Sequence, residues 1–208
     1  MPPDNKYELE ARNAGIKLIA GIDEAGRGPL AGPVVAAAVI LDIDANIEGI
    51  NDSKLLSSKQ RDKLFSKIHQ NALSIGLSIV EPETIDRINI LQATRLAMTK
   101  AVTNLALKPG LLLIDGPITL DINTRQIPII KGDRLSISIS AASIIAKVTR
   151  DGIMKSFHNM YPEYGFYKNK GYGTKEHIAA LKKYGPCKIH RKSFAGIGEY
   201  YGENFVGG

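Results

Sequence analysis

The sequence predicts an α/β domain in which helices flank a five-stranded mixed sheet, followed by a basic helical segment. Short apolar runs with the length of buried strands alternate with longer segments whose apolar residues recur every three or four positions. At 208 residues, with 44% hydrophobic and 23% charged residues, the chain has the composition of a globular protein that buries a full core. Its length suits one large domain with an appendage.

Composition also restricts the class of protein. No apolar run approaches the roughly 20 residues that cross a bilayer, and the polar first 15 residues contain no apolar signal-peptide core. The single cysteine, Cys187, excludes an internal disulfide and a cysteine-based zinc site. We therefore expect a cytoplasmic monomer with no membrane partner.

The N-terminal half should begin with two strands joined by a glycine-rich turn. The apolar runs at 17–22 and 33–41 have the length of buried strands, and they should pair antiparallel because only the turn separates them. A helix should follow from Ser57, a favourable N-cap, to about Gln70. The alternating segment at 72–80 is expected to form the third strand.

Two helices and two further strands should come next. Pro82 suits the first turn of a helix over 81–88, and 91–107 is an amphipathic helix ended by a Lys-Pro-Gly sequence. The apolar segments at 111–114 and 126–130 have the length of the fourth and fifth strands.

The rest of the chain is expected to be helical. A helix over 139–160 begins with small residues, which predicts close packing, and a loop rich in tyrosine and glycine leads to a last helix at 174–184. These boundaries predict an α/β domain at 1–160 and a basic helical appendage at 161–208 that packs on it.

Positive charge is concentrated in the second half of the chain. Residues 1–107 carry 12 Lys and Arg against 13 Asp and Glu, whereas residues 108–208 carry 15 against 8. Within 168–192, eight basic residues accompany a single acid, Glu176. Such a concentration is typical of a polyanion-binding face, although a solvated face without a ligand has the same composition.

Four carboxylates follow the predicted strands. Asp23 and Glu24 come after the first strand, Asp115 after the fourth and Asp133 after the fifth. Ligands of α/β sheets bind beyond strand ends, where side chains from neighbouring strands converge. Oxygen donors are the ligands that Mg²⁺ and Mn²⁺ prefer, and four of them suit two ions about 4 Å apart that hydrolyse a phosphodiester in line. The pattern predicts such a site.

Each acid that stands alone also has a structural alternative. Asp115 precedes a glycine and fits a turn, and Asp133 could cap the helix that follows. Asp151 is expected to be a helix residue that pairs with Lys147 or Arg150. The two adjacent acids after the first strand fit this alternative least well, because one turn needs only one acid.

The glycine-rich turn also matches a dinucleotide-binding fingerprint. Residues 26–31 read G-x-G-x-x-A after a strand. That fingerprint must open a helix, however, and Pro29 and Pro33 prevent one. The two neighbouring carboxylates would also repel a pyrophosphate, so we reject dinucleotide binding.

Six segments of the chain resemble ribonuclease HII, the type 2 ribonuclease H. They are GIDEAGRGPLAGPVVAAAVIL at 21–41, NDSK at 51–54, LLIDG at 112–116, KGD at 131–133, SAASIIAKVTRD at 140–151 and YPEYGFYKNKGYGTKEHIAALKKYGPCKIHRKSF at 161–194. They occur in order over nearly the whole chain, and several are long, so the resemblance is specific.

The resemblance implies a ribonuclease H-like fold and hydrolysis of the RNA strand of RNA–DNA hybrids. It also implies incision 5′ of single ribonucleotides embedded in duplex DNA, leaving 3′-hydroxyl and 5′-phosphate ends. These duplexes would be the partners, and two Mg²⁺ or Mn²⁺ ions the cofactor. The family's metal-binding acids correspond to Asp23, Glu24, Asp115 and Asp133, which leaves Asp151 structural.

The resemblance also implies how substrate is recognised. The family senses a ribonucleotide with a Gly-Arg-Gly loop and a tyrosine, here Gly26, Arg27, Gly28 and Tyr172. Glycines let the backbone approach the 2′-hydroxyl, and Tyr172 can stack on the sugar or base. Without the resemblance, Tyr172 would be interpreted as a half-buried aromatic. Sequence-independent phosphate contacts are expected from Lys54, Lys147, Lys175, His190 and Arg191.

Two other functions stay open. A basic duplex-binding protein whose acids serve as caps would bind without metal-dependent cleavage. A nuclease or recombinase on the same fold would act on DNA alone, and the 2′-hydroxyl-sensing loop argues against it.

Overall fold

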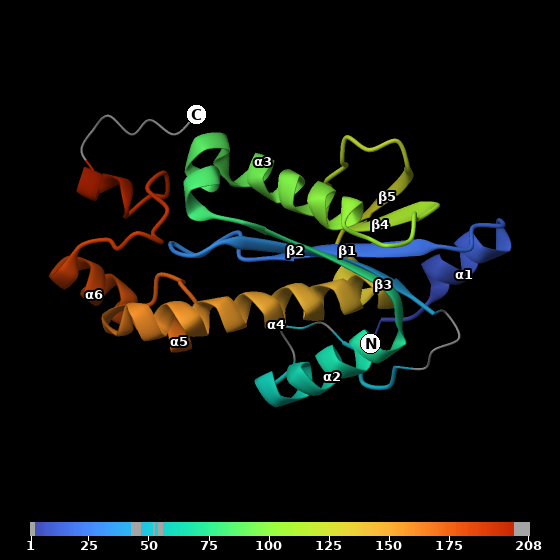
Figure 1. The fold of residues 1–208 in the computed structure, drawn as a ribbon, viewed down its shortest axis with the longest axis horizontal. Coiled ribbons are helices and arrows are strands. Elements are labelled where there is room, and N and C mark those ends of the chain that lie inside the picture. The colour runs from blue at the N-terminus through green and yellow to red at the C-terminus, as the bar shows by residue number, and fades with distance from the viewer. Residues whose placement is uncertain (1–2, 43–46, 52, 54–55, 202–208) are drawn as a thin grey trace.

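The structure, a computed structural model, describes residues 3–42, 47–51, 53 and 56–201, and its centre is a five-stranded sheet (Figure 1). The strands are β1 (Ile19–Ala25), β2 (Val34–Leu41), β3 (Ala72–Val80), β4 (Leu111–Asp115) and β5 (Arg125–Ile129). They lie in the order β3-β2-β1-β4-β5. The pairs β1–β2 and β2–β3 are antiparallel, whereas β1–β4 and β4–β5 are parallel. The predicted mixed sheet is confirmed.

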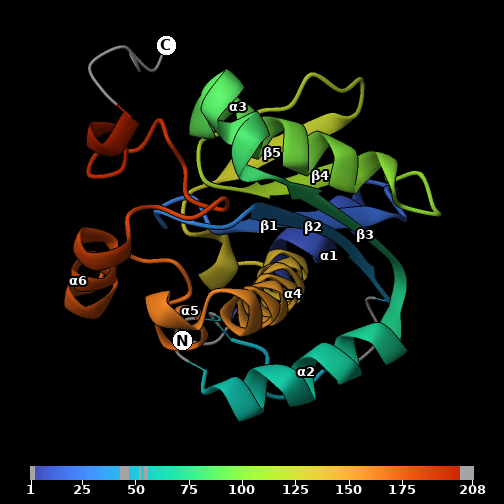
Figure 2. The ribbon, with the colours of Figure 1, turned by 60° about the vertical axis from the view of Figure 1, so that its left-hand side comes forward.

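Helices cover both faces of this sheet, with α3 on one face and α4 and α2 on the other (Figure 2). The helices are α1 (Lys6–Asn13), α2 (Ser58–Asn71), α3 (Pro82–Thr103), α4 (Ile137–Met160), α5 (Phe166–Asn169) and α6 (Lys175–Tyr184), with short 3₁₀ turns η1 (Gly132–Arg134), η2 (Pro162–Tyr164) and η3 (Gly198–Tyr201). Along the described ranges, no helix is long and apolar enough to cross a membrane.

Several boundaries differ from the predictions, most clearly in the helical segments. The two helices expected between 81 and 107 form α3, which is kinked at Asn89 (φ 63°). This helix ends at Thr103, where the next residue, Asn104, donates a side-chain hydrogen bond to the carbonyl of Leu77 at 2.9 Å. The expected loop between α4 and α6 contains η2 and α5. Side-chain hydrogen bonds and tertiary contacts determine where these helices end. The spacing of apolar residues in the sequence indicates neither of them.

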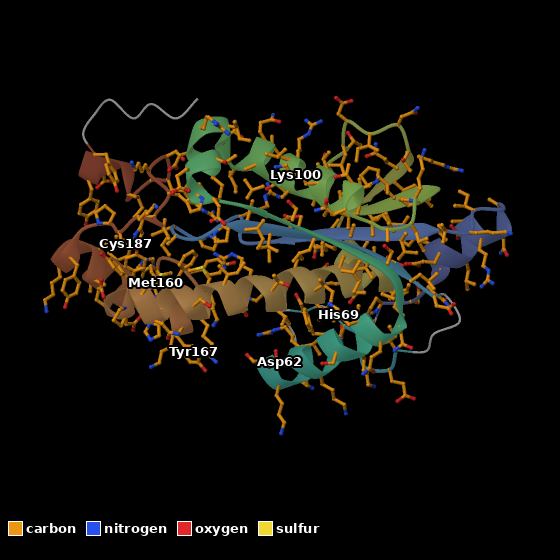
Figure 3. All side chains as sticks on the ribbon, in the orientation of Figure 1. Asp62, His69, Lys100, Met160, Tyr167 and Cys187 are labelled. Atoms are coloured by element: carbon orange, nitrogen blue, oxygen red, sulfur yellow. The ribbon has the colours of Figure 1, made fainter. Side chains whose placement is uncertain are left out.

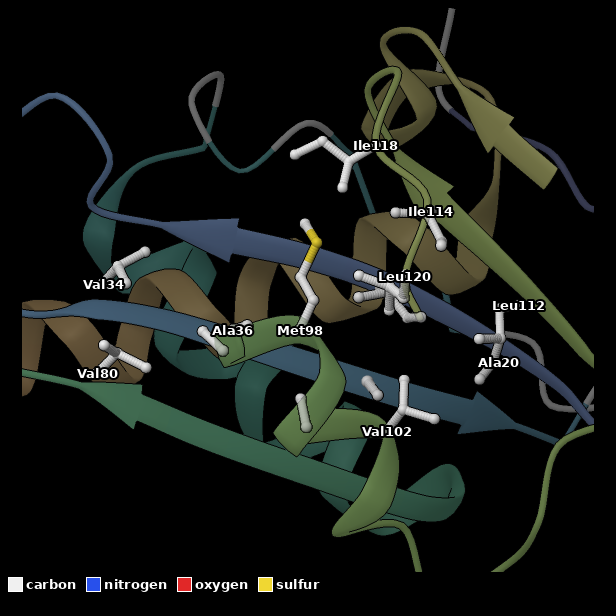
Figure 4. Packing of buried hydrophobic residues seen from close by; sticks show 14 of the residues in the cluster. Ala20, Val34, Ala36, Val80, Met98, Val102, Leu112, Ile114, Ile118 and Leu120 are labelled. Atoms are coloured by element: carbon white, nitrogen blue, oxygen red, sulfur yellow. The ribbon is translucent and has the colours of Figure 1, made fainter. Parts of the chain in front are cut away.

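Two apolar clusters enclose the sheet. One joins β1, β2 and β4 to α3 through residues such as Val34, Met98 and Leu112 (Figure 4). The other joins the opposite face of β2 to α4 and α2 through residues such as Val35 and Ile144. Both faces of β2 are buried, which explains its continuous apolar sequence.

The start of α4 lies directly against β1. A Cβ atom placed on Gly21 would lie 2.0 Å from the carbonyl carbon of Ser138, so only glycine permits this approach. Gly21 and Asp23 are two residues apart on one strand and therefore face the same side of the sheet. The side chain of Asp23 is thus directed toward α4.

The C-terminal segment has an apolar cluster of its own. Phe166, Leu181 and Ile197 pack with Met154 near the end of α4 and with Ala31 after β1. The segment 161–201 therefore lies against the same region of the chain that follows the first two acids. The domain boundary at 160 stays a prediction.

Candidate active site

Parallel pairing brings two of the four acids together. Ile22 of β1 is the partner of Ile114 of β4, so the next residues, Asp23 and Asp115, are lateral neighbours at a strand spacing of about 4.8 Å. Asp23 and Glu24 were expected after the first strand, but they lie within β1. Their backbone pairs with β2, and this pairing continues the strand regardless of their side chains.

Asp133 approaches the same site through its neighbour. The backbone N–H of Gly132 donates to Asp115 Oδ1 at 2.7 Å, and Asp133 follows in η1 with only 4% of its surface exposed. Asp133 does not cap the next helix, because Ser136 Oγ accepts the N–H of Ile139 at 3.2 Å. The cap of this helix is Ser136, so the capping role considered for Asp133 is wrong.

The electrostatics of these acids fit a divalent cation. Burial raises the pKa of Asp23 well above its ordinary value, and the negative charges of Glu24 and Asp115 raise it further. Burial also raises the pKa of Glu24, opposed by Arg27, whose Nη1 lies 3.5 Å from Glu24 Oε1. Glu24 Oε2 is buried and, among the described atoms, has no hydrogen-bond partner. A bound cation would satisfy this oxygen and reduce the repulsion between the carboxylates.

The acids do not form a closed metal cage. In the ranges that the structure describes, no three His, Cys, Asp or Glu side chains are arranged to hold an ion. Asp23 Oδ1 accepts the N–H of Glu24 at 2.7 Å, and Asp115 Oδ1 accepts that of Gly132, so one oxygen of each carboxylate is occupied. Mg²⁺ typically binds through one or two carboxylates, water and substrate phosphate, which this open arrangement suits.

A cavity of about 300 Å³ joins two of the acids to the glycine-rich loop. Asp23 and Glu24 form one wall, and the lining also includes Gly26, Arg27, Gly28, Ser53, Ser143, Lys147, Arg150 and Tyr172. A Cβ atom on Gly28 would lie 3.6 Å from Tyr172 Cε1, so these two residues face each other. The ring of Tyr172 is accessible, with 47% of the residue exposed. The structure thus brings the predicted sensing residues to the carboxylates.

Two buried arginines hold this loop. Arg191 donates to the carbonyls of Gly26 (2.5 Å), Arg27 (2.9 Å) and Gly32 (2.9 Å). Arg150 donates in the same way to three carbonyls, those of Pro33, Ala31 and Lys170. Burial lowers the pKa of Arg191 to about 9 and that of Arg150 to about 10. The guanidinium of Arg191 is therefore not available for the phosphate contact expected of it.

His190 is likewise internal, in a chain of hydrogen bonds. The N–H of Cys187 lies 2.9 Å from His190 Nδ1, His190 Nε2 lies 3.0 Å from His177 Nε2, and His177 Nδ1 lies 2.8 Å from the carbonyl of Tyr172. One proton arrangement satisfies all three bonds: His177 donates to Tyr172, and His190 donates to His177. Both rings are then neutral. This series of hydrogen bonds fixes the backbone of Tyr172. Because His190 is buried, the prediction that it contacts phosphate is wrong.

The other predicted phosphate ligands have different settings. Lys147 lines the cavity and bonds Asp151 at 2.7 Å, which confirms the predicted pairing of that acid. Lys175 is exposed in the first turn of α6. Lys54 lies outside the described residues.

Three site residues were missed from the sequence. Ser143 bonds Ser53 at 2.9 Å, and its hydrogen bond to Asp23 opposes the rise in the pKa of that acid. Arg150 and His177 hold the loop and Tyr172. A signal for Arg150 existed, because it stands four residues from both Ala146 and Met154 on the apolar side of its helix.

Comparison with known proteins decides the family. The family model for Ribonuclease HII matches residues 20–197. The chain belongs to the ribonuclease HII family. Ribonuclease HII of Acetivibrio thermocellus is 61% identical over 188 residues, which cover 90% of this chain and 73% of that protein. Ribonuclease HII of Bacillus subtilis is 54% identical over 191 residues, covering 92% and 74%. The chain is thus a ribonuclease H, an endonuclease that hydrolyses the RNA strand of RNA–DNA hybrids.

Solved structures confirm the ribonuclease H-like fold. The crystal structure of ribonuclease H2 from Pyrococcus horikoshii matches with a TM-score of 0.74 and 31% identity, covering 88% of this chain and 97% of that one. Bst-RNase HIII in complex with Mn²⁺ matches with a TM-score of 0.67 over 93% of this chain and 72% of that one. At 19% identity, this second ribonuclease supports the fold alone.

Proposed function

We propose that this ribonuclease HII also incises 5′ of a single ribonucleotide in duplex DNA, leaving 3′-hydroxyl and 5′-phosphate ends, with two Mg²⁺ or Mn²⁺ ions as cofactor. One observation carries this proposal. A single cavity is lined by two of the carboxylates, Asp23 and Glu24, by the Gly-Arg-Gly loop and by Tyr172. A scissile phosphate at the acids would therefore lie beside groups suited to examine the adjoining ribose.

The four acids would hold the ions. Asp23 interacts with the charges of both Glu24 and Asp115, so it is the candidate to bind both ions. Glu24 and Asp115 would complete one position, and Asp133 would serve the other. Such ions activate the attacking water and stabilise the leaving 3′-oxygen. The protein needs no side-chain nucleophile for this reaction.

The loop would recognise the 2′-hydroxyl. Arg191 fixes the carbonyls of Gly26 and Arg27, so the backbone near the ribose is rigid before substrate arrives. Tyr172 lies close to Gly28, and both line the cavity, where the exposed ring can stack on the sugar. A ribose carries the 2′-hydroxyl that these residues would recognise, and a deoxyribose does not.

Basic side chains would position the duplex. Lys147 lies in the cavity, and Lys175 stands exposed on the C-terminal segment that also carries Tyr172. In this proposal the segment 161–208 forms an appendage to a catalytic domain at 1–160. Contacts of lysine with phosphate do not distinguish bases, so cleavage should show little sequence preference.

The test compares three labelled substrates in Mg²⁺, Mn²⁺ or EDTA: a DNA duplex with one ribonucleotide, an all-DNA duplex and an RNA–DNA hybrid. We expect one metal-dependent cut 5′ of the ribonucleotide, with the all-DNA duplex intact. Cleavage of the hybrid alone would contradict the proposed incision at single ribonucleotides. Cleavage that persists in EDTA would contradict the role of the ions.

A further inference from the structure

A second basic groove, of about 280 Å³, lies beside the catalytic cavity. It is bounded by the start of α2, the C-terminal half of α4 and the end of α5, and its lining includes Arg61, Asp151, Lys155, Tyr167 and Lys170. In Figure 3, Tyr167 on α5 and Asp62 on α2 lie on the same side of the molecule, and both line the groove.

The groove lining carries three cations, Arg61, Lys155 and Lys170, against two carboxylates, Asp62 and Asp151. Asp151 is already engaged by Lys147 at 2.7 Å and by Arg61 at 3.8 Å. Across the described part of the chain, neither Lys155 nor Lys170 has a carboxylate within ion-pair distance. Burial lowers the pKa of Lys170, and repulsion from nearby cations lowers it further, with Asp151 opposing. An anion bound here would relieve this repulsion.

The fold holds two of these cations, Lys170 and Arg61, in place. The backbone of Lys170 is left-handed (φ 51°), and its carbonyl accepts Arg150 Nη1 at 3.0 Å. Its ammonium lies 4.8 Å above the ring of Tyr167. Arg61 donates to the carbonyls of Ser53 and Leu56 at 2.9 and 2.6 Å. This groove therefore differs from a surface with scattered, freely moving lysines.

One ion pair on α4 links the groove to the catalytic cavity. Lys147 lines the cavity and bonds Asp151, which lines the groove. Lys155 follows Lys147 by eight residues, roughly 12 Å along the helix. We propose that this groove binds a backbone phosphate of the substrate duplex at a distance from the scissile one. The inference rests on the proposed function, and its ligand is a phosphodiester of either strand.

The first test measures binding without cleavage. A fluorescent duplex with one ribonucleotide is titrated in EDTA at several salt concentrations with wild type and with the double variant Lys155→Gln/Lys170→Gln. We expect the slope of log affinity against log salt to fall in magnitude by about one, and affinity at moderate salt to fall roughly threefold. Equal slopes for wild type and the double variant would overturn the proposal that the groove binds a phosphate.

A matched control separates the groove from net charge. Lys100→Gln/Lys108→Gln removes the same charge from exposed positions on α3 and shortly after it, on the face of the sheet opposite the groove. This variant should keep the wild-type slope. An equal loss of slope in both double variants would overturn the site, because any lysine pair would then serve. Thermal unfolding confirms that each variant is folded.

A second test identifies the phosphate. Single neutral methylphosphonates are introduced along either strand, and affinity is measured for wild type and for the groove double variant. At the position that contacts the groove, the neutral linkage should lower the affinity of wild type for the duplex. It should not lower the affinity of the double variant further. That position names the strand. Additive effects at every position would overturn the proposal. Cleavage by wild type in Mg²⁺ is measured separately. A failure of the proposed single-ribonucleotide incision can therefore be distinguished from a failure of phosphate binding in the groove.

Discussion

Asp23 is the most constrained acid of the site, because it is buried next to two other carboxylates. Asp23→Asn keeps the shape and removes the charge that a cation needs. We expect cleavage of hybrid and single-ribonucleotide duplexes to fall at least about 100-fold, while binding in EDTA is retained. The thermal midpoint should not fall, because the variant removes repulsion.

Single-turnover cleavage and anisotropy measure these two outcomes. Asp121→Asn, at an exposed position, is the matched control and should cleave as wild type. Cleavage by Asp23→Asn near the wild-type rate would remove Asp23 from the site.

Gly28 and Tyr172 are expected to act on one substrate more than the other. A methyl group at Gly28 would lie 3.6 Å from Tyr172, an ordinary contact, so Gly28→Ala should fold normally while filling the gap between them. We expect incision at a single ribonucleotide to fall more than hybrid cleavage, because a hybrid offers many ribose positions. The ratio of the two rates is the measurement. An unchanged ratio for Gly28→Ala and Tyr172→Ala would remove both from sensing.

His190 should make stability depend on pH. Burial and His177 lower its pKa to about 4, so the folded state favours the neutral ring. Its contribution is full above the unfolded pKa of about 6.5 and is lost as pH falls toward 4. The difference corresponds to about 3 kcal/mol. Unfolding free energies between pH 4 and 8 should therefore fall on the acid side.

The variant His190→Gln should flatten this dependence, and the exposed His69→Gln should not. Parallel pH curves for wild type and His190→Gln would contradict the assignment.

The loop at 26–33 depends on arginine rather than on positive charge. Arg191→Lys keeps the charge but cannot reach three separate carbonyls with one planar fork. We expect the free energy of unfolding to drop by about 2–4 kcal/mol, because buried carbonyls lose their donors, and cleavage of both substrates to fall. Chemical denaturation measures the first effect. Lys192→Ala, at the exposed neighbour, should change neither, and a neutral Arg191→Lys would contradict this role.

The elements themselves were predictable where local pattern and tertiary pairing agree. β3 occupies the predicted residues, because its alternating sequence lies between a helix end and Pro82. β1 runs three residues further than predicted, because pairing with β2 satisfies the backbone of Asp23 and Glu24 whatever their side chains. The helix kink at Asn89 had no signal in apolar spacing.

The same limit applies to the site. The acids were found because each stands next to an apolar strand, a local feature of the sequence. From the sequence, Arg191 and His190 are expected to contact phosphate, because their actual partners are distant carbonyls and a second histidine that local sequence does not indicate. A residue whose role is to hold a distant loop has the same local sequence as one that faces solvent.

Across the whole molecule, the four acids come from segments that are far apart in the sequence. Asp23 and Glu24 come from β1, Asp115 from β4 and Asp133 from η1, so ions bound among them would link the centre of the sheet to the start of α4. A ligand that binds only the folded state stabilises it. We therefore expect Mg²⁺ or Mn²⁺ to raise the thermal midpoint of the EDTA-treated protein in the absence of substrate.

Matched ionic strength isolates this effect, so the control titration uses NaCl, which should not reproduce the shift. Glu24→Gln should reduce the shift, because it removes the charge from the carboxylate whose Oε2 has no hydrogen-bond partner among the described atoms. The NaCl arm decides between specific binding and general screening of the carboxylate repulsion. A midpoint that responds equally to Mg²⁺ and NaCl would mean that the acids hold no ion until the substrate phosphate is present.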